Sequence, residues 1–166
     1  MLAALVGCLL CGVVCQLLFT ETRHGGTLAE SLQLKLWQRR TLELVKSDLE
    51  RASSWQIDPH PSADWPCALA DRQPKLAITP TDGSDPVMYS LGPAPSAIWR
   101  GDVLMRCGPA FDLWGGIRRG SSYQNRVVLD GVDLFQLHQP SGLPVLQMQL
   151  EQRTSLGGRV RSRGVG

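Results

Sequence analysis

Residues 1–19 form an uninterrupted apolar run, and this run constrains the fold more than any other feature of the chain. It reads MLAALVGCLLCGVVCQLLF, carries no charge and has Gln16 as its one strongly polar side chain. As a helix at about 1.5 Å per residue it would be roughly 28 Å long, close to the roughly 30 Å hydrocarbon thickness of a bilayer. We therefore predict a transmembrane helix over residues 1–19.

A cleaved secretory signal is the alternative interpretation of this run. Such a signal needs a positive segment before its apolar core and small residues at its cleavage site. No Lys or Arg precedes the run, and the residues that follow it read TETR. The sequence therefore favours an anchor. The charges near the run do not settle its orientation, because Arg23 and Lys35 lie only on the C-terminal side.

A second helical pattern, amphipathic in character, continues over residues 20–54, with a break predicted at Gly25-Gly26. Asp48 and Arg51 are placed for a weak i,i+3 ion pair. Ser53-Ser54 is expected to end the helix. Apolar residues at spacings of three and four form a stripe that should pack on a sheet. The stripe begins with Leu28, Leu32 and Leu36, spaced by four. The members predicted to be buried against the sheet, the predicted packing stripe, are Leu42, Val45, Leu49 and Ala52.

Short apolar runs between Pro and Gly residues predict a small β-rich domain over residues 55–153. Asp130-Gly131 is a turn signal that predicts a hairpin over 126–138. The strand candidates are Leu76 to Thr79, Val87 to Leu91, Ala97 to Cys107, Arg126 to Asp130, Val132 to His138 and Val145 to Gln152. We therefore predict an α+β fold, in which a long N-terminal helix, half transmembrane and half amphipathic, packs on a small antiparallel β-sheet.

The segment 154–166 lacks periodicity and is predicted to be a disordered basic tail. The formal net charge of the chain is +2, and residues 151–166 hold four arginines against one glutamate, so the remainder is close to neutral. Contact of this tail with nucleic acid or anionic lipid would be weak and strongly salt-dependent. A solvated tail is the simpler interpretation, and no broad nucleic-acid footprint follows from the composition.

Cys67 and Cys107 are the only cysteines beyond the apolar run, and their isolation favours a disulfide over two unrelated buried thiols. The histidines show no metal-ligand spacing, and the aspartates of the Pro-rich region lack a calcium-loop pattern. Nothing local marks a catalytic nucleophile. We therefore predict no catalytic residue, no metal and no cofactor. The residues weighed are His24, His60, His138, Asp58, Asp64, Asp71, Asp82 and Asp85.

The order of these segments resembles the type IV pilin and pseudopilin superfamily. The start Met1-Leu2-Ala3-Ala4-Leu5 matches the end of the family motif G-F-T-L-I-E-M-L-A-A-L. The segment KLWQRRTLELVKSDLERASSW (35–55) is similar to the helix of minor pilins and J-type minor pseudopilins, which ends in D-L-x-R-A. VLMRCGPAFDLWG (103–115) and RVVLDGVDLFQL (126–137) are similar in order to the same class.

The basic leader, the glycine, the phenylalanine and the glutamate of the family motif would all lie upstream of Met1. We therefore expect the prepilin motif to begin before the printed sequence. The resemblance implies a non-catalytic subunit that assembles into, or primes, a type IV pilus or a type II secretion-like filament. Its partners would be other pilin or pseudopilin subunits, through the N-terminal helix, and membrane lipid. It implies a single-pass protein of the bacterial inner membrane with an extracytoplasmic domain.

Two rival functions remain beside this one. An unrelated single-span envelope protein could bind a partner through its extracytoplasmic domain. A membrane-tethered enzyme would need a pocket with convergent titratable groups.

Overall fold

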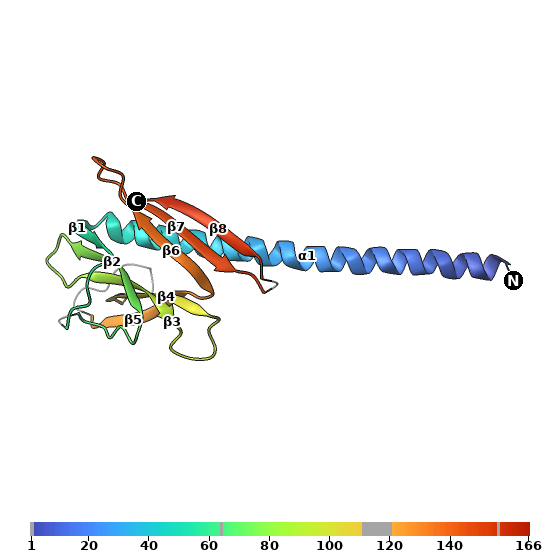
Figure 1. The fold of residues 1–166 in the computed structure, drawn as a ribbon, viewed down its shortest axis with the longest axis horizontal. Coiled ribbons are helices and arrows are strands. Elements are labelled where there is room, and N and C mark those ends of the chain that lie inside the picture. Colours follow the sequence, from blue (N-terminus) through green and yellow to red (C-terminus); the bar gives the residue numbers. More distant parts are fainter. Residues whose placement is uncertain (1, 64, 111–120, 156) are drawn as a thin grey trace. The chain divides into compact units, whose positions relative to one another are not determined.

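The structure, a computed structural model, describes residues 2–63, 65–110, 121–155 and 157–166, and in the helix before residue 28 it describes the side chains of residues 12 and 16 alone. The chain divides into two compact units, Met1–Leu34 and Lys35–Gly166. Among the described residues, one helix is followed by eight strands, and Figure 1 shows their arrangement. In chain order these are α1 (Leu2–Leu49), β1 (Ala52–Ile57), β2 (Gln73–Pro80), β3 (Val87–Pro93), β4 (Asp102–Pro109), β5 (Tyr123–Leu129), β6 (Val132–His138), β7 (Gln147–Arg153) and β8 (Arg159–Val165).

The strands form two antiparallel sheets. The first has five strands in the order β1-β2-β3-β4-β5, and the second has three in the order β6-β7-β8. Each strand therefore pairs with its neighbour in the sequence, except that β5 and β6 belong to different sheets. The first half of β7 alternates as a half-buried strand does, since Met148 and Leu150 are buried while Gln147 is exposed, but Glu151 and Gln152 are both buried.

The core of the Lys35–Gly166 unit lies where both sheets and the C-terminal part of α1 meet. Short apolar runs from strands of both sheets supply most of its side chains, as expected where inner faces of two sheets share one interior. From α1 come Leu42, Val45 and Leu49. The strands and adjoining residues contribute Leu76, Ile78, Val87, Tyr89, Leu104, Leu129, Val132, Phe135, Leu146, Met148 and Leu150.

This architecture contradicts the predicted α+β fold class. The described chain is mostly β, with two antiparallel sheets rather than one small sheet under a long helix. Two strands escaped prediction because their sequences lack apolar alternation. β1 reads ASSWQI, and its first three residues, 52–54, were predicted to belong to the helix, whereas α1 ends at Leu49. β8 reads RVRSRGV, and Val160 is its one buried side chain.

The C-terminal segment is likewise not a disordered tail. β8 pairs with β7 without a register shift, from Gln147 opposite Val165 to Arg153 opposite Arg159. Its charge pattern misled the prediction, because Arg161 and Arg159 pair with acidic residues of the sheet, at 2.5 Å from Glu151 and 3.4 Å from Asp133. The helix is also continuous through Gly25-Gly26, where a break was predicted.

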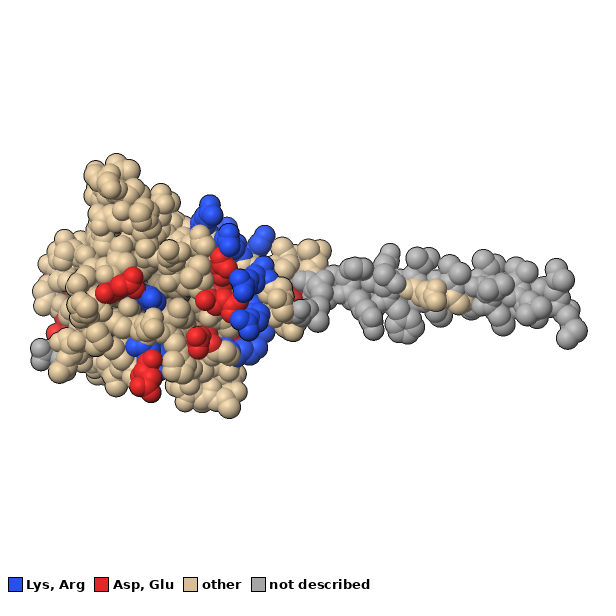
Figure 2. Space-filling model, viewed as in Figure 1, with Lys and Arg blue, Asp and Glu red and all other residues tan. Residues whose placement is uncertain are grey.

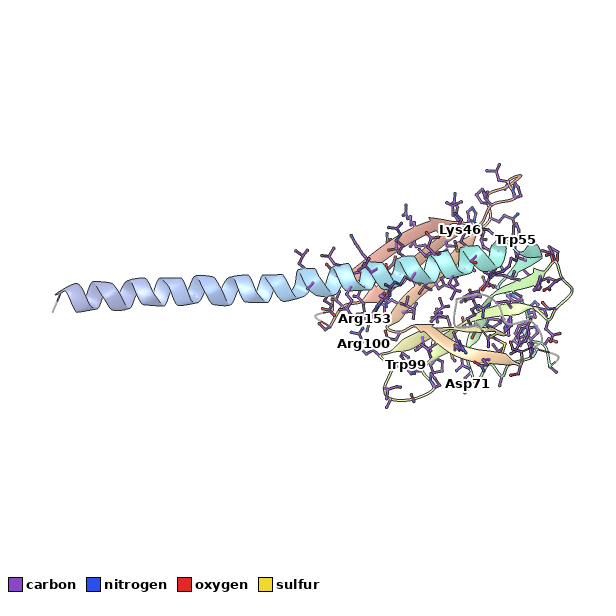
Figure 3. All side chains as sticks on the ribbon, turned by 180° about the vertical axis from the view of Figure 1, so that it is seen from behind. Lys46, Trp55, Asp71, Trp99, Arg100 and Arg153 are labelled. Atoms are coloured by element: carbon purple, nitrogen blue, oxygen red, sulfur yellow. A yellow bond between two sulfur atoms is a disulfide. The ribbon has the colours of Figure 1, made fainter. Side chains whose placement is uncertain are left out.

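The predicted hairpin over 126–138 is replaced by a corner between the sheets. Gly131 adopts a positive φ of 61°, which suits glycine. Its N–H donates to the carbonyl of Arg100 at 2.6 Å, and its own carbonyl accepts from the N–H of Arg153 at 3.0 Å. Arg100 and Arg153 therefore lie close together at this corner (Figure 3). Asp130-Gly131 does turn the chain, as the sequence predicted, but the strand that follows it, β6, belongs to the three-stranded sheet and does not pair with β5.

Within the part of α1 whose side chains are described, charged residues recur too often for a membrane span. These residues are Glu30, Lys35, Arg39, Arg40, Glu43, Lys46 and Asp48. No helix among the described residues is long and apolar enough to cross a membrane. This contradicts the predicted single-pass inner-membrane location, and the mostly β fold does not fit the membrane-anchored pilin layout. Most side chains of the run 1–19 lie outside the described residues.

A charge placed at Val45 tests whether α1 is part of the domain core. Val45 is fully buried, whereas Glu43, two residues earlier, is exposed. Val45→Asp should lower the free energy of unfolding by about 4 kcal/mol, because it buries an unpaired carboxylate. Glu43→Asp should change it by less than about 0.5 kcal/mol. Urea denaturation of both variants, followed by near-ultraviolet circular dichroism, makes the comparison. Equal denaturation midpoints would mean that α1 does not belong to the core.

Candidate functional site

Cys67 and Cys107 form the disulfide that the sequence predicted, with their Cα atoms 6.0 Å apart. Cys107 lies in β4, opposite Asn125 of β5, and Cys67 lies in the connection between β1 and β2. The Asn125 side-chain amide also donates to the carbonyl of Ala68 at 2.9 Å. The disulfide and this bond therefore tie the long β1–β2 connection to the sheet, and both are structural.

The predicted packing stripe divides between the helix and the first strand. Leu42, Val45 and Leu49 are buried and belong to the core that α1 shares with both sheets. Ala52 is half-buried and is the first residue of β1, not part of α1. The stripe thus holds the last turns of the helix against the sheets and leads directly into the first strand.

Asp48 is a buried carboxylate at the end of α1, and it is the centre of a buried polar cluster. It accepts hydrogen bonds from Arg106 Nε at 2.7 Å, Arg106 Nη2 at 3.0 Å and the Tyr89 hydroxyl at 2.6 Å. The Asp48 and Arg106 side chains are only 1% and 3% exposed. Arg51 adds the i,i+3 pair that the sequence predicted, at 3.1 Å. We call Asp48, Tyr89 and Arg106 the buried triad.

The buried triad joins α1 to the middle of the five-stranded sheet, because Tyr89 lies in β3 and Arg106 lies in β4, directly opposite each other. The two-point contact between Arg106 and Asp48 is the geometry that makes such pairs strong. Gly108 leaves room for it, since a Cβ there would lie 2.5 Å from Arg106 Nη1. The sequence thus supplies both the two charges of the ion pair and, through the missing side chain of Gly108, the room for the Arg106 guanidinium.

The surroundings of the triad raise the pKa values of both Tyr89 and Arg106, which keeps both side chains protonated. Burial raises the pKa of Tyr89 well above its ordinary value, and the negative charge of Asp48 raises it further. Burial alone would lower the pKa of Arg106, but the hydrogen bonds and charge of Asp48 outweigh this, so that the pKa lies above its ordinary value. Tyr89 therefore stays protonated and Arg106 stays charged at neutral pH.

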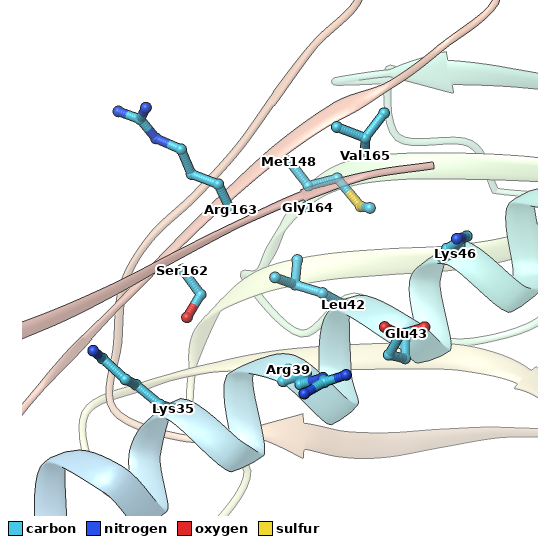
Figure 4. A pocket seen from close by; sticks show the side chains of 10 residues that line it. All are labelled: Lys35, Arg39, Leu42, Glu43, Lys46, Met148, Ser162, Arg163, Gly164 and Val165. Atoms are coloured by element: carbon cyan, nitrogen blue, oxygen red, sulfur yellow. The ribbon is translucent and has the colours of Figure 1, made fainter.

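A groove lies between α1 and β8, on the Lys35–Gly166 unit (Figure 4). Its volume is about 410 Å³. Four cationic side chains and one acidic side chain line it, with Leu42 and Met148 at its apolar base; the charged residues are Lys35, Arg39, Lys46, Arg163 and Glu43. We call this the basic groove. Lys and Arg side chains form a band on one face of the same unit (Figure 2).

The basic groove is electrostatically unsatisfied within the described residues. No carboxylate of this part of the chain lies within 4.0 Å of the Lys35, Arg39, Lys46 or Arg163 nitrogens, although Glu43 shares the lining. The arginines that precede Arg163 in β8 do have acidic partners. The groove therefore presents positive charge to solvent in a concave setting, where it attracts anions most strongly.

The other residues considered from the sequence do not converge. Asp58 pairs with Lys75 at 3.2 Å, and Asp82 accepts from the backbone N–H of Ser84 at 3.0 Å. His138 borders a separate hollow on β6, and Asp64 and the side chain of His24 lie outside the described residues. Within the described part, no three His, Cys, Asp or Glu residues gather as metal ligands would.

No protein-family model, curated protein or solved structure matches this chain. The assignment of function therefore depends on the physical character of its own residues.

Sequence reasoning missed the buried triad and the basic groove for the same reason. Both join residues far apart in the chain, 58 positions for Asp48 and Arg106. The sequence held one local signal for the triad. Arg106 lies between apolar residues in a strand candidate, and a charged side chain buried in such a strand needs a buried partner of opposite charge. The groove had no such signal, because its β8 wall was predicted to be disordered.

Alkaline titration tests the environment of Tyr89. A tyrosine whose pKa is raised by folding contributes stability that is fully present below about pH 10, the unfolded value, and is lost as the pH rises further. Tyr89→Phe removes this group, so the stability difference from the parent chain should shrink by about 1.4 kcal/mol per pH unit above pH 10.

Tyr123→Phe is the matched control, because Tyr123 is only half-buried and donates its hydroxyl hydrogen bond to the Asp85 carbonyl rather than to a buried carboxylate. Burial also raises the pKa of Tyr123, but less than that of Tyr89, so the stability difference for Tyr123→Phe should change less with pH. Urea denaturation of the three proteins between pH 7 and 11 gives the comparison. A difference for Tyr89→Phe that stays constant across this range would contradict the assigned environment.

Proposed function

We propose that the protein is a non-catalytic structural subunit that joins other subunits of a filament through α1. The filament would be of the type IV pilus or type II secretion class, and the subunit a minor pilin- or pseudopilin-type component that assembles into it or primes it. The proposal makes no use of a membrane-spanning helix. Its partners would be other subunits of the same filament.

The observation that supports the proposal most is a row of exposed leucines on α1. Leu28, Leu32 and Leu36 are 62%, 55% and 59% exposed. They recur every four residues, and side chains at that spacing lie on one side of a helix. Single exposed leucines are ordinary, but a row over successive turns loses free energy while it faces water. A helix from a neighbouring subunit is an occupant that would cover such a row.

The attachment of the last turns of α1 to the β domain also suits a subunit that carries tension. The last turns of the helix are held by the core through Leu42 and Val45, and by the buried triad through Asp48. A force applied to these last turns of the helix would therefore be passed to the sheets. This arrangement supports the proposal, since a filament subunit must carry tension between its assembly helix and its displayed domain.

Photo-crosslinking tests the proposal in cells that produce the full chain. A photoreactive amino acid at exposed Gln33 should form adducts, identified by mass spectrometry, with subunits that carry a similar apolar N-terminal helix. Leu32→Glu combined with Leu36→Glu should reduce these adducts at least tenfold, because two charges would enter the helix interface.

The matched control variant is Ala29→Glu combined with Arg40→Gln, which makes the same net charge change of two at exposed, non-leucine positions of the helix outside the basic groove. It should keep most of the adducts. Adducts that survive Leu32→Glu with Leu36→Glu, or that contain only proteins without such a helix, would contradict the proposal.

A further inference from the structure

The outer edge of β8 is a free sheet edge. β8 is the last strand of the three-stranded sheet, and β7 is its one paired neighbour in that sheet. Leu146 and Gly166 exchange both backbone hydrogen bonds, at 2.9 and 3.0 Å, and the register continues from there without a shift. Because bonded pairs alternate along an antiparallel ladder, Arg161, Arg163 and Val165 direct their backbone N–H and C=O groups away from β7.

None of the hydrogen bonds found among the described residues occupies those outward groups of Arg161 and Arg163. A free edge of this kind is a template for another strand, which would gain main-chain hydrogen bonds on binding. The remaining question is which strand the edge accepts.

Hollows border β8 on both faces of the sheet. The basic groove lies on the face toward α1, and a second hollow of about 500 Å³ lies on the opposite face, against β6 and β7. Arg163, Gly164 and Val165 border both. Successive side chains of an added strand point to opposite faces, so they would enter the two hollows in turn.

The charges on the two faces define the pattern of the incoming strand. On the α1 side, Lys35, Arg39 and Lys46 follow one another along the helix opposite β8 (Figure 4). On the other face the lining is mostly polar and uncharged, with Gln136 and Gln149, and Arg163 and His138 also border it. A strand with carboxylates at alternate positions would match the first face and leave neutral polar residues for the second.

A second copy of the same edge is a poor occupant. β8 carries Arg159, Arg161 and Arg163, so two β8 edges side by side would bring like charges together across the new pair. Natural sheets use charged edge strands to prevent such self-pairing. The charges on β8 therefore disfavour pairing with a second β8 edge and favour pairing with an acidic strand.

We propose that the free edge of β8 is a docking site for an extended acidic segment of a partner protein. The segment adds as a fourth strand beside β8 and places alternate carboxylates in the basic groove, against Lys35, Arg39 and Lys46. This site does not depend on the assembly function of α1, since all its residues belong to the Lys35–Gly166 unit.

A fluorescein-labelled synthetic peptide with five Glu-Thr repeats, acetylated and amidated, is the probe. Its binding to the full chain is followed by fluorescence anisotropy in 0.15 M salt. The same peptide N-methylated at every second residue, in either phase, keeps its charge but loses main-chain donors. We expect the methylation phase that blocks the bonds to β8 to weaken binding at least tenfold, and the other phase to weaken it little.

The variant Lys35→Glu with Arg39→Glu should weaken binding of the parent peptide at least tenfold. Arg126→Glu with Arg100→Glu, which makes the same charge change at exposed positions outside the groove, should leave it within about threefold. Arg163→Pro removes an outward N–H without removing a bond to β7, so it should also weaken binding at least tenfold while the melting temperature changes little.

Three results would overturn the proposal. The first is no binding of the parent peptide at millimolar concentration. The second is equal loss, or no loss, for the two methylation phases, which would mean attraction by charge without strand addition. The third is binding of a DNA duplex, sensitive to the Lys35 and Arg39 changes, at least as tight as peptide binding, which would assign the groove to nucleic acid. None of these results bears on crosslinking through α1, so the two proposals fail separately.

Discussion

The ion pair between Asp48 and Arg106 is the interaction on which the rest of the structure depends. It lies at the point where α1 ends and the first strand begins, and it holds that point against the middle of the five-stranded sheet. Two buried charges are stable there because each satisfies the other at two points, with the Tyr89 hydroxyl as a further donor. Removing one partner would leave an uncompensated buried charge, which is far more costly than the pair is favourable.

The two sheets complete the core that this pair positions. Side chains from α1 and both sheets enter one apolar cluster, and the Asp130-Gly131 corner carries the chain from one sheet to the other. The arrangement leaves two features turned outward: the exposed leucines of α1 and the free edge of β8. Each fits a different kind of partner, an apolar helix for the first and an acidic strand for the second.

Much of this could be predicted where the signal is local. Val132 to His138 matches β6 residue for residue, and the isolation of Cys67 and Cys107 was enough to indicate their disulfide. Prediction failed where partners are distant or the pattern is weak. The polar strand β8 looks disordered until it pairs with β7, and Asp130-Gly131 marks a turn without revealing which sheet follows. The fold class was also wrong: the described chain is mostly β, and among its described residues no helix is long and apolar enough to cross a membrane.

A double-mutant cycle on Asp48→Leu and Arg106→Met measures the central interaction directly. Each single variant should lower the free energy of unfolding by about 3–5 kcal/mol, while the double variant should lose much less than their sum, because no buried charge is then left alone. The same cycle on the exposed pair Asp58 and Lys75 should give a coupling below about 1 kcal/mol. Single-variant effects at Asp48 and Arg106 that add to within about 0.5 kcal/mol would contradict the coupling, and with it the role of this pair as the anchor of α1.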